Sequence, residues 1–295
     1  MTVSRISTES RAGPVARVRA RVRAEFGEEA ARLIPAGYQR LGSVVLIRLP
    51  DSLRPAFPTI GSAFRSALGV DTVLRRRGPV VGEFREPSIE PIAGDSGETT
   101  VQEHGVRFRF DATRLLFARG NRAERHRFGR LVRAGETVVD LFAGIGYFSL
   151  PALVTGGAGL VHAVEKNPVS FGFLSENLRL NRVEKRARIY LGDNREIALP
   201  IGSADRIVLG FLPSSLPWVG TALPFLRPSG GWLHVHLLVG TLAGRVGATR
   251  RVEAAVDVAG GRAGEVRARE VKPYGPGRSH VVVDAWVTPG PSARR

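Results

Sequence analysis

The residues best suited to chemistry are polar residues at the ends of three predicted strands. A valine-rich run leads into Gly144 and Gly146, where the absence of a Cβ lets the backbone approach a ligand closely. Glu165 closes a second apolar run, and Asp193 with Asn194 follows a third. A carboxylate at the second strand end is placed to hold ribose hydroxyls, and the third pair is placed to read an adenine edge. The three strand ends together predict a site for a nucleoside cofactor.

The glycine turn favours one such cofactor. Gly144 and Gly146 lack the third glycine of a dinucleotide fingerprint. Asp140, just before the turn, would repel a pyrophosphate and attract the ammonium group of a methionine. We therefore predict S-adenosylmethionine as the cofactor, with Asp140 and Gly144 among its contacts. The alternative is that Asp140 only caps the turn and Glu165 is a solvated loop acid, an interpretation that must explain each strand end separately.

The elements that position these groups begin at Thr137, where predicted strands start to alternate with helices. A helix is expected from Pro168, which suits a first turn, to Asn181, which suits a carboxyl end. The final two strands lie close in sequence, as in an antiparallel hairpin at a sheet edge. This order predicts an α/β fold with a Rossmann-like class I S-adenosylmethionine-dependent transferase domain. The seven strands are expected at 137–141, 160–165, 187–191, 204–209, 231–238, 264–271 and 280–288.

The composition indicates the cellular compartment of the protein and the kind of partner that it binds. The chain has 295 residues and no cysteine, which excludes disulfides and thiolate metal sites. No apolar stretch approaches the length of a membrane span, and the arginine-rich N-terminus lacks the apolar core of a signal peptide. We expect a cytoplasmic protein with no membrane partner. The net charge of +16 favours RNA or DNA as a partner, whereas genomic base composition explains only the excess of arginine over lysine.

Five segments are expected along the chain. Before the transferase domain, the pattern predicts a small basic α+β domain with a helix over 57–68 and strands that include 82–85. Six arginines between 119 and 133 form either a basic rim of the cofactor site or a solvated helix face. The segments are a basic N-terminal segment with a mobile start (1–36), the small domain (37–114), a basic linker and rim (115–136), the cofactor-binding domain (137–289) and a disordered tail (290–295).

Several separated motifs carry a resemblance to a known family. They are Phe117-Ala118-Arg119-Gly120-Asn121 with Glu124-Arg125, the glycine turn, Glu165-Lys166-Asn167-Pro168, and Gly192-Asp193-Asn194-Arg195. Together they are similar to the tRNA guanine-37 modification enzymes, whose two branches are N1-methyltransferases and wybutosine-pathway 3-amino-3-carboxypropyltransferases. The runs 210–215 and 230–236 closely resemble the second branch, and the resemblance extends over about residues 40 to 288.

The loop after the fourth strand supports the second branch. Many methyltransferases of base nitrogens carry an Asn/Asp-Pro-Pro-aromatic loop there, whose amide aims the nitrogen at the methyl group. Here the loop is Leu212-Pro213-Ser214-Ser215, without amide or carboxylate. The resemblance therefore implies transfer of the 3-amino-3-carboxypropyl group to the wyosine-type precursor at guanosine 37 of tRNA-Phe, with release of methylthioadenosine. N1-methylation of guanine-37 is the nearest rival, and a non-catalytic RNA-binding protein is the rival of another class.

The resemblance also implies roles for individual residues. Arg125 would contact the methionine carboxylate or orient the transferred chain, although lysine is common at that position. Ala118 stands where the family commonly has serine, so only a backbone contact is expected there. The implied cofactor contacts are Ala118, Arg125, Glu165, Asp193 and Asn194, and the substrate contacts are Asn121, Pro213, Ser214 and Ser215. The partner would be the anticodon loop of tRNA at position 37, contacted by the small domain, and the enzyme would be a monomer.

Other candidates have simpler interpretations. His234 and His236 share a face of one predicted strand, but no third ligand of suitable spacing is evident, so strand packing is favoured and no metal is expected. Tyr147, Phe211 and Trp218 suit either stacking on a flipped base or core packing. The sequence identifies no general base, and the catalytic residues stay unassigned. Most of the rate is expected from placing the reacting atoms.

Overall fold

The computed structural model describes residues 13–240 and 244–291 in two compact units. The first unit contains the chain up to Val101 together with Arg109–Phe117, and the second contains Gln102–Phe108 and the chain from Ala118 onward. The expected mobile start lies outside the described residues, as does most of the expected tail. No helix in the described ranges is long and apolar enough to cross a membrane.

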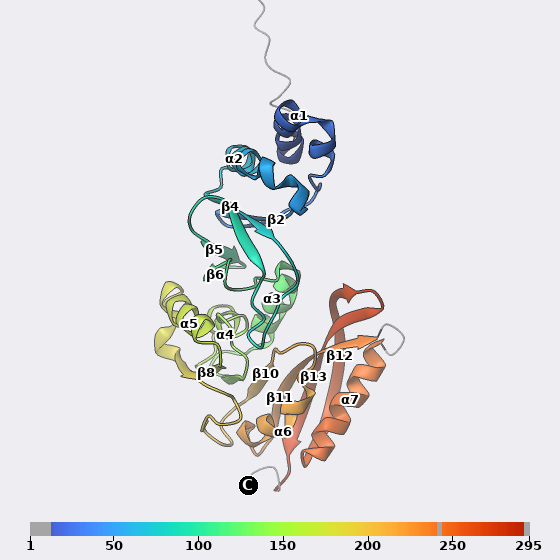
Figure 1. Cartoon of the computed structure of the whole chain (residues 1–295). Coiled ribbons are helices and arrows are strands. Elements are labelled where there is room, and N and C mark those ends of the chain that lie inside the picture. Colours follow the sequence, from blue (N-terminus) through green and yellow to red (C-terminus); the bar gives the residue numbers. More distant parts are fainter. Residues whose placement is uncertain (1–12, 241–243, 292–295) are drawn as a thin grey trace, which may run out of the picture. The chain divides into compact units, whose positions relative to one another are not determined.

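The first unit is an α+β domain whose four strands form one sheet (Figure 1). Its elements are α1 Pro14–Arg32, β1 Gln39–Leu41, β2 Val44–Arg48, α2 Phe57–Leu68, β3 Thr72–Arg76 and β4 Ile89–Ala93. The strand order is β1-β2-β3-β4, with β2 and β3 parallel and the outer pairs antiparallel. The helix expected over 57–68 is confirmed as α2. It ends at Gly69, whose positive φ of 59° suits a glycine after a helix.

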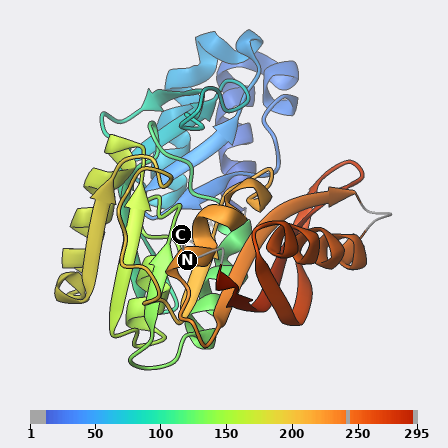
Figure 2. The ribbon, with the colours of Figure 1, turned by 90° about the horizontal axis from the view of Figure 1, so that it is seen from below.

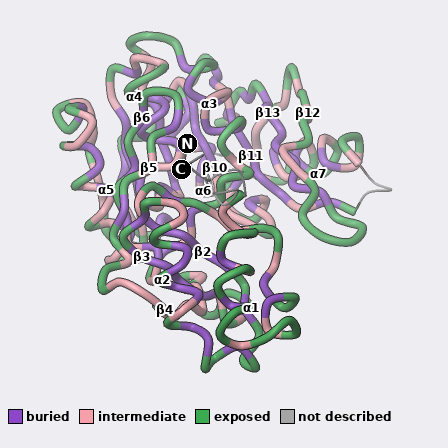
Figure 3. The backbone as a smooth tube through the Cα atoms, turned by 90° about the horizontal axis from the view of Figure 1, so that it is seen from above, coloured by how far each residue is buried: buried purple, intermediate pink, exposed green. Residues whose placement is uncertain are grey.

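Both helices of this unit pack into its core. Val18 and Val22, one helical turn apart on α1, are fully buried in the same cluster as Val45, Ile60 and Phe64. Burying side chains of this size contributes roughly 1.5–3 kcal/mol each, so the apolar stripe attaches the otherwise charged α1 to the domain. Figure 3 shows the buried stretches of β2 and α2 in purple.

The strand expected over 82–85 is wrong, because this segment forms a turn. Val81 and Glu86 exchange backbone hydrogen bonds of 3.0 and 2.9 Å across it. Gly82 and Arg85 both have positive φ, 71° and 56°, which bends the chain back on itself. The strand that the pattern missed, β4, carries Pro91 and lies at the sheet edge, where a missing N–H is tolerated.

A β-hairpin joins the two units in sequence. Its strands are β5 Glu98–Glu103 and β6 Val106–Asp111, connected by His104 and Gly105 with φ of 48° and 84°. Positive φ at both central residues is the geometry of a tight hairpin turn. The base of the hairpin belongs to the first unit, where Thr99 Oγ1 donates a 2.7 Å hydrogen bond to Leu41 O. The tip belongs to the second unit and brings Glu103 there.

The second unit is built on a seven-stranded sheet with helices on both faces (Figure 2). Its strands are β7 Thr137–Asp140, β8 Leu160–Glu165, β9 Ala187–Leu191, β10 Arg206–Leu209, β11 Gly231–Gly240, β12 Gly261–Gly275 and β13 Arg278–Pro289. Its helices are α3 Arg122–Leu131, α4 Ser149–Val154, α5 Pro168–Leu180, α6 Val219–Ala222 and α7 Gly244–Val258.

All seven strands expected in this region are confirmed, with ends shifted by a few residues. The strand order is β12-β13-β11-β10-β7-β8-β9, and β7 to β11 run parallel. The expected antiparallel hairpin at the edge is β12 with β13, which also pairs antiparallel with β11. This order places β7 and β10 at the centre, so their carboxyl ends lie at the switch point where doubly wound folds bind ligands.

The two faces of the sheet differ in character. Val235 and Leu237 of β11 pack with Val252 of α7 in one apolar cluster, and α7 runs along β12 and β13 in Figure 1. The intervening His234 and His236 point to the other face, because side chains alternate along a strand. That face of the sheet carries polar and charged side chains near α3.

Candidate cofactor and acceptor site

The glycine turn follows β7 and closes on itself through backbone hydrogen bonds. Gly146 N donates to Ala143 O at 2.8 Å, and both glycines have positive φ. A Cβ at Gly144 would lie 2.7 Å from the Tyr147 ring, and one at Gly146 would lie 2.8 Å from Leu150. The glycines are therefore required by the packing of the turn itself, in addition to any close approach of a ligand.

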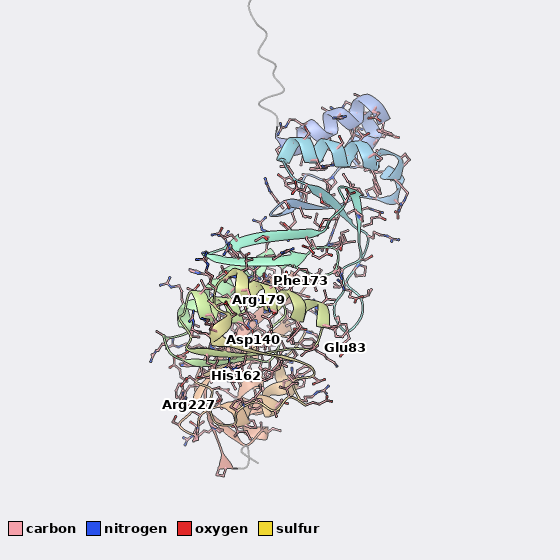
Figure 4. The ribbon with its side chains drawn as sticks, turned by 90° about the vertical axis from the view of Figure 1, so that its left-hand side faces the viewer. Glu83, Asp140, His162, Phe173, Arg179 and Arg227 are labelled. Carbon is pink, nitrogen blue, oxygen red and sulfur yellow. The ribbon has the colours of Figure 1, made fainter. Side chains whose placement is uncertain are left out.

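Asp140, labelled in Figure 4, is the last residue of β7 and directly precedes this turn. It is fully buried, and its carboxylate accepts hydrogen bonds from Phe142 N at 3.2 Å and Ser149 Oγ at 2.8 Å. Burial raises the pKa of Asp140 to about 7, and these two bonds limit the rise. The contacts are those of a turn cap. Contact with a methionine ammonium stays a prediction.

Glu165 connects the end of β8 to the glycine turn. Its Oε2 accepts a 2.7 Å hydrogen bond from Gly144 N, and its Oε1 accepts one of 2.7 Å from Asn167 N. Burial raises the pKa of the carboxyl, while these backbone donors lower it. A carboxylate has about four lone-pair sites, and three backbone donors, Gly144, Asn167 and Lys166, leave room for a further donor such as a ribose hydroxyl. The expected ribose contact fits this geometry and stays a prediction.

Asp193 and Asn194 follow β9 and differ in whether their side-chain oxygens already have hydrogen-bond partners. Asp193 accepts from Arg195 at 2.6 Å and pairs with Lys166 at 3.3 Å, and the hydrogen bond from Arg195 is the main cause of its lowered pKa. Asn194 is buried, and its Nδ2 donates to Leu141 O at 2.8 Å. Its Oδ1 is buried without a hydrogen-bond partner in the described structure. A buried acceptor of this kind suits an amino group such as that of adenine.

The motif around Ala118 precedes α3. Ala118 is exposed, and its carbonyl accepts a 3.2 Å hydrogen bond from Arg125 Nη1. Arg125 is only 3% exposed, and its Nε and Nη2 each donate to Glu103 at 2.9 Å. Asn121 lies at the start of α3, and its Oδ1 is buried without a partner in the described structure. Arg125 thus supports the segment that carries Asn121, while its contact with a methionine carboxylate stays a prediction.

The loop after β10 lies along β11. Pro213 O accepts a 2.7 Å hydrogen bond from Leu238 N, and Ser215 N donates to His236 O at 3.0 Å. Ser215 is fully buried, and its hydroxyl bonds Leu209 O and Phe211 O at 2.7 and 2.8 Å. Ser215 therefore shapes the loop in this conformation and has no surface for a substrate.

The other loop residues are more accessible. Pro213 is exposed, and the partly exposed Ser214 uses its hydroxyl to accept a 3.3 Å hydrogen bond from Leu216 N. Phe211 stacks on Phe142 with ring centroids 5.2 Å apart, and Trp218 meets both rings at 5.1 Å. These aromatic contacts are internal packing. Pro213 and Ser214 stay predicted substrate contacts.

A buried ionic cluster fills the polar sheet face near α3, and the sequence patterns did not reveal it. Arg127 donates to Glu124 at 2.8 and 2.7 Å and to Asp284 at 2.6 and 3.1 Å. His234 Nδ1 lies 2.5 Å from Asp284 Oδ1, and Arg206 lies 2.7 Å from His234 Nε2. His234 thus bridges an acid and a base in the interior, and strand packing describes its role. No group of three or more potential ligands in the described part of the chain could hold a metal ion.

Lys272 is a second residue that the sequence patterns missed. It lies on β12 opposite His280 of β13. A Cβ at Gly120 would lie 2.9 Å from Lys272 Cδ and 3.1 Å from its Nζ, so the amine reaches the motif that carries Ala118 and Asn121. The only available signal was rarity, because three lysines stand among 43 basic residues.

The strand ends of the second unit fit S-adenosylmethionine. The unpartnered Asn194 Oδ1 offers an acceptor to adenine, and the Glu165 carboxylate offers acceptors to the ribose. The sheet order, the glycine turn and these strand ends define a class I S-adenosylmethionine-dependent transferase fold.

Family comparisons define the chain further. Residues 99–259 match the TRM5/TYW2 methyltransferase domain, and residues 18–97 match the TYW2 N-terminal domain. The chain belongs to the TRM5/TYW2 family.

Known relatives share most of the chain. The tRNA(Phe) (4-demethylwyosine(37)-C(7)) aminocarboxypropyltransferase of Pyrococcus horikoshii is 34% identical over 271 residues, which cover 92% of this chain and 96% of that protein. The Arabidopsis thaliana tRNA wybutosine-synthesizing protein 2/3/4 is 40% identical over 214 residues, 71% of this chain but only 21% of that longer protein. The crystal structure of P. horikoshii TYW2 in complex with MeSAdo aligns with a TM-score of 0.82 and 32% identity, covering 93% and 99% of the two chains.

Proposed function

We propose that this protein transfers the 3-amino-3-carboxypropyl group of S-adenosylmethionine to the wyosine-type base at position 37 of tRNA-Phe. The observation that carries the proposal is the combination of family matches. A TYW2 N-terminal domain directly precedes the TRM5/TYW2 domain, and the P. horikoshii aminocarboxypropyltransferase is similar over nearly the whole of both chains. The cytoplasm as compartment and a monomeric state belong to the same proposal.

The cofactor would be held by the strand ends of the second unit. Glu165 would accept from the ribose hydroxyls while it fixes Gly144, and Asn194 would accept from adenine. Asp193, paired with Lys166 and Arg195, would border the adenine as a charged group rather than a free acceptor. When bound, the sulfonium supplies a carbon that a nucleophile can attack and a neutral thioether as leaving group.

The acceptor side would be formed by Asn121, Pro213 and Ser214. Asn121 Oδ1 is a buried acceptor, and the loop at Pro213 is fixed to β11 by its backbone hydrogen bond to Leu238. Neither loop residue carries the amide or carboxylate that would aim a base nitrogen at a methyl group. The residues therefore favour an acceptor carbon that is placed by shape, with alignment of the reacting atoms at about 3–3.5 Å.

The mass of the modified tRNA tests this proposal. Incubation with S-adenosylmethionine and tRNA-Phe carrying the tricyclic precursor should add the mass of the aminocarboxypropyl group and release methylthioadenosine. A methyl increment with S-adenosylhomocysteine would instead support the guanine-37 N1-methyltransferase. Calorimetry addresses the third possibility, because a chain that binds tRNA without binding S-adenosylmethionine would be a non-catalytic RNA-binding protein.

We further propose that tRNA is held through phosphate contacts, some of them at α3. The net charge of +16 supports this, and Arg122 is exposed near the cofactor motif. Each phosphate contact contributes a slope of about −0.7 to −0.9 to the dependence of log affinity on log salt. We therefore expect tRNA affinity to fall steeply with salt, and Arg122→Ala to reduce the slope by roughly one contact. Filter binding at several salt concentrations measures this, with the exposed Arg251→Ala on α7 as control.

A further inference from the structure

Lys272 is a basic residue of the second unit to which the proposed function assigns no role. Its side chain crosses Gly120, with Nζ 3.1 Å from the position that a Cβ there would take. The neighbouring Asn121 presents its unpartnered Oδ1, and Arg125 binds the Ala118 carbonyl. The amine therefore reaches the segment to which the cofactor and acceptor contacts are assigned.

The choice of lysine at this position is informative. The chain has 43 lysines and arginines together, and only Lys166, Lys185 and Lys272 are lysines. Lys166 pairs with Asp193, and Lys185 is exposed. A guanidinium stays charged at every accessible pH, whereas an ammonium can lose its proton when it is partly buried. A chain that uses arginine for most of its cations thus places a titratable amine beside the motif.

The surroundings of Lys272 lower the pKa of its amine. It is partly buried and makes no hydrogen bond or ion pair with any described residue. Burial lowers its pKa, and the positive charge of Arg125 on α3 lowers it further. From β13 it faces His280, a neutral group because burial, the main cause, lowers the histidine pKa to about 4. His280 is in turn fixed by a 2.9 Å hydrogen bond to His236 of β11.

The strand that carries Lys272 is irregular on both sides of it. The pairing of β12 with β13 shifts register between Glu270 and Lys272 and again between Pro273 and Gly275. Bulges of this kind re-aim a side chain and are frequent beside active sites. Here the irregular pairing flanks the residue whose amine reaches the motif.

We propose that Lys272 is the proton acceptor of the transfer reaction. The inference rests on the proposed function, because substitution at an aromatic ring carbon must release the proton that this carbon carried. A bond forms between the ring carbon and the methylene carbon of the transferred group, and the carbon–sulfur bond breaks with its electron pair passing to sulfur. The ring proton then passes to the neutral amine of Lys272, which becomes an ammonium, and the ring recovers its aromatic electrons.

Single-turnover kinetics with the precursor tRNA test the assignment. Lys272→Met and Lys272→Arg should each slow transfer roughly 100-fold or more, the usual size of an acid–base contribution, while affinities for S-adenosylmethionine and tRNA stay unchanged. The wild-type rate should rise with pH through one ionisation below the usual lysine range, and Lys272→Met should lose that rise. A precursor deuterated at the acceptor carbon should react more slowly than the protiated one in both variants. Lys185→Arg is the matched control and should leave rate and pH profile unchanged.

A second variant separates position from folding. Gly120→Ala keeps the amine, but its Cβ would displace the flexible end of Lys272, so transfer should again slow while thermal unfolding stays close to that of the wild type. Wild-type rate and pH profile in Lys272→Arg would overturn the assignment, because a guanidinium cannot accept the proton. If the wild-type enzyme adds only a methyl group, the proposed function fails first, and the role of Lys272 fails with it.

Discussion

Glu165→Ala should weaken S-adenosylmethionine binding roughly 100-fold, with tRNA affinity unchanged. The substitution removes a charged acceptor of the ribose, and such hydrogen bonds contribute about 1.5–3 kcal/mol each. It also frees Gly144 N and Asn167 N, which the carboxylate now accepts at 2.7 Å, so the glycine turn loosens as well. Calorimetry with S-adenosylmethionine and filter binding with tRNA measure the two affinities separately.

Two further variants show whether the loss of affinity reflects a direct contact between Glu165 and the cofactor. Glu165→Gln keeps one acceptor oxygen and should lose less affinity for the cofactor than Glu165→Ala. Glu184→Ala, an exposed acid between α5 and β9, should bind the cofactor like the wild type. Equal loss of cofactor and tRNA binding in Glu165→Ala would mean that this residue supports the fold generally and that the ribose assignment is wrong.

Arg127→Met should be the most destabilising single substitution proposed for this protein, at about 3–5 kcal/mol of unfolding free energy. Arg127 bridges Glu124 and Asp284, which are only 2% and 9% exposed. Removing the guanidinium leaves Glu124 without its ion-pair partner and leaves Asp284 with His234 as its remaining partner. Urea unfolding monitored by circular dichroism measures the loss, and the exposed Arg130→Met on the same helix should change stability by less than about 0.5 kcal/mol.

The pH dependence of this loss identifies its cause. In the wild type, burial would raise the pKa of Asp284, but His234 and Arg127 outweigh burial and hold it low. In Arg127→Met the pKa of Asp284 should rise relative to the wild type, because one of the two groups that lower it is gone. The variant should therefore gain less stability than the wild type when this carboxyl ionises, so the deficit should be largest above about pH 5 and should shrink as the pH falls below about 4. A deficit independent of pH would point to lost packing instead.

The sequence was informative where burial on both sides of a strand leaves a continuous apolar run. The strands β7 and β8 are such runs, and the acids Asp140 and Glu165 that end them could be read directly. The helix α5 was equally visible, because Pro168 begins it and Asn181 follows it. Local chemistry thus sufficed for the central sheet and for the position of the glycine turn.

The missed features depend on contacts between distant residues. The strand β4 is short, half-exposed and contains Pro91, so neither alternation nor propensity marked it. Arg127 and Asp284 form an ion pair although they are 157 positions apart in the sequence. Lys272 lies next to Gly120 only because the fold brings β12 to the segment that precedes α3. Asp140 could be placed on its strand, but the depth to which the turn buries it could not. Such side-chain partners are set by tertiary packing. A single sequence contains no periodicity or spacing that indicates which distant residues meet.

The pairing of β11 with β13 has a consequence for how this sheet can vary. His234 lies opposite Asp284 on the face beneath α3, while Val235 opposes Val283 on the face beneath α7. A slip of one residue along either strand would exchange the two faces, bringing charge against α7 and valines against Arg127. The hydrogen bond between His234 and Asp284 is therefore compatible with a single alignment of the two strands. Insertion or deletion of one residue within β13 should therefore abolish folding. Changes in length should be tolerated at the hairpin end near Gly275, which lies beyond the pair of Lys272 and His280.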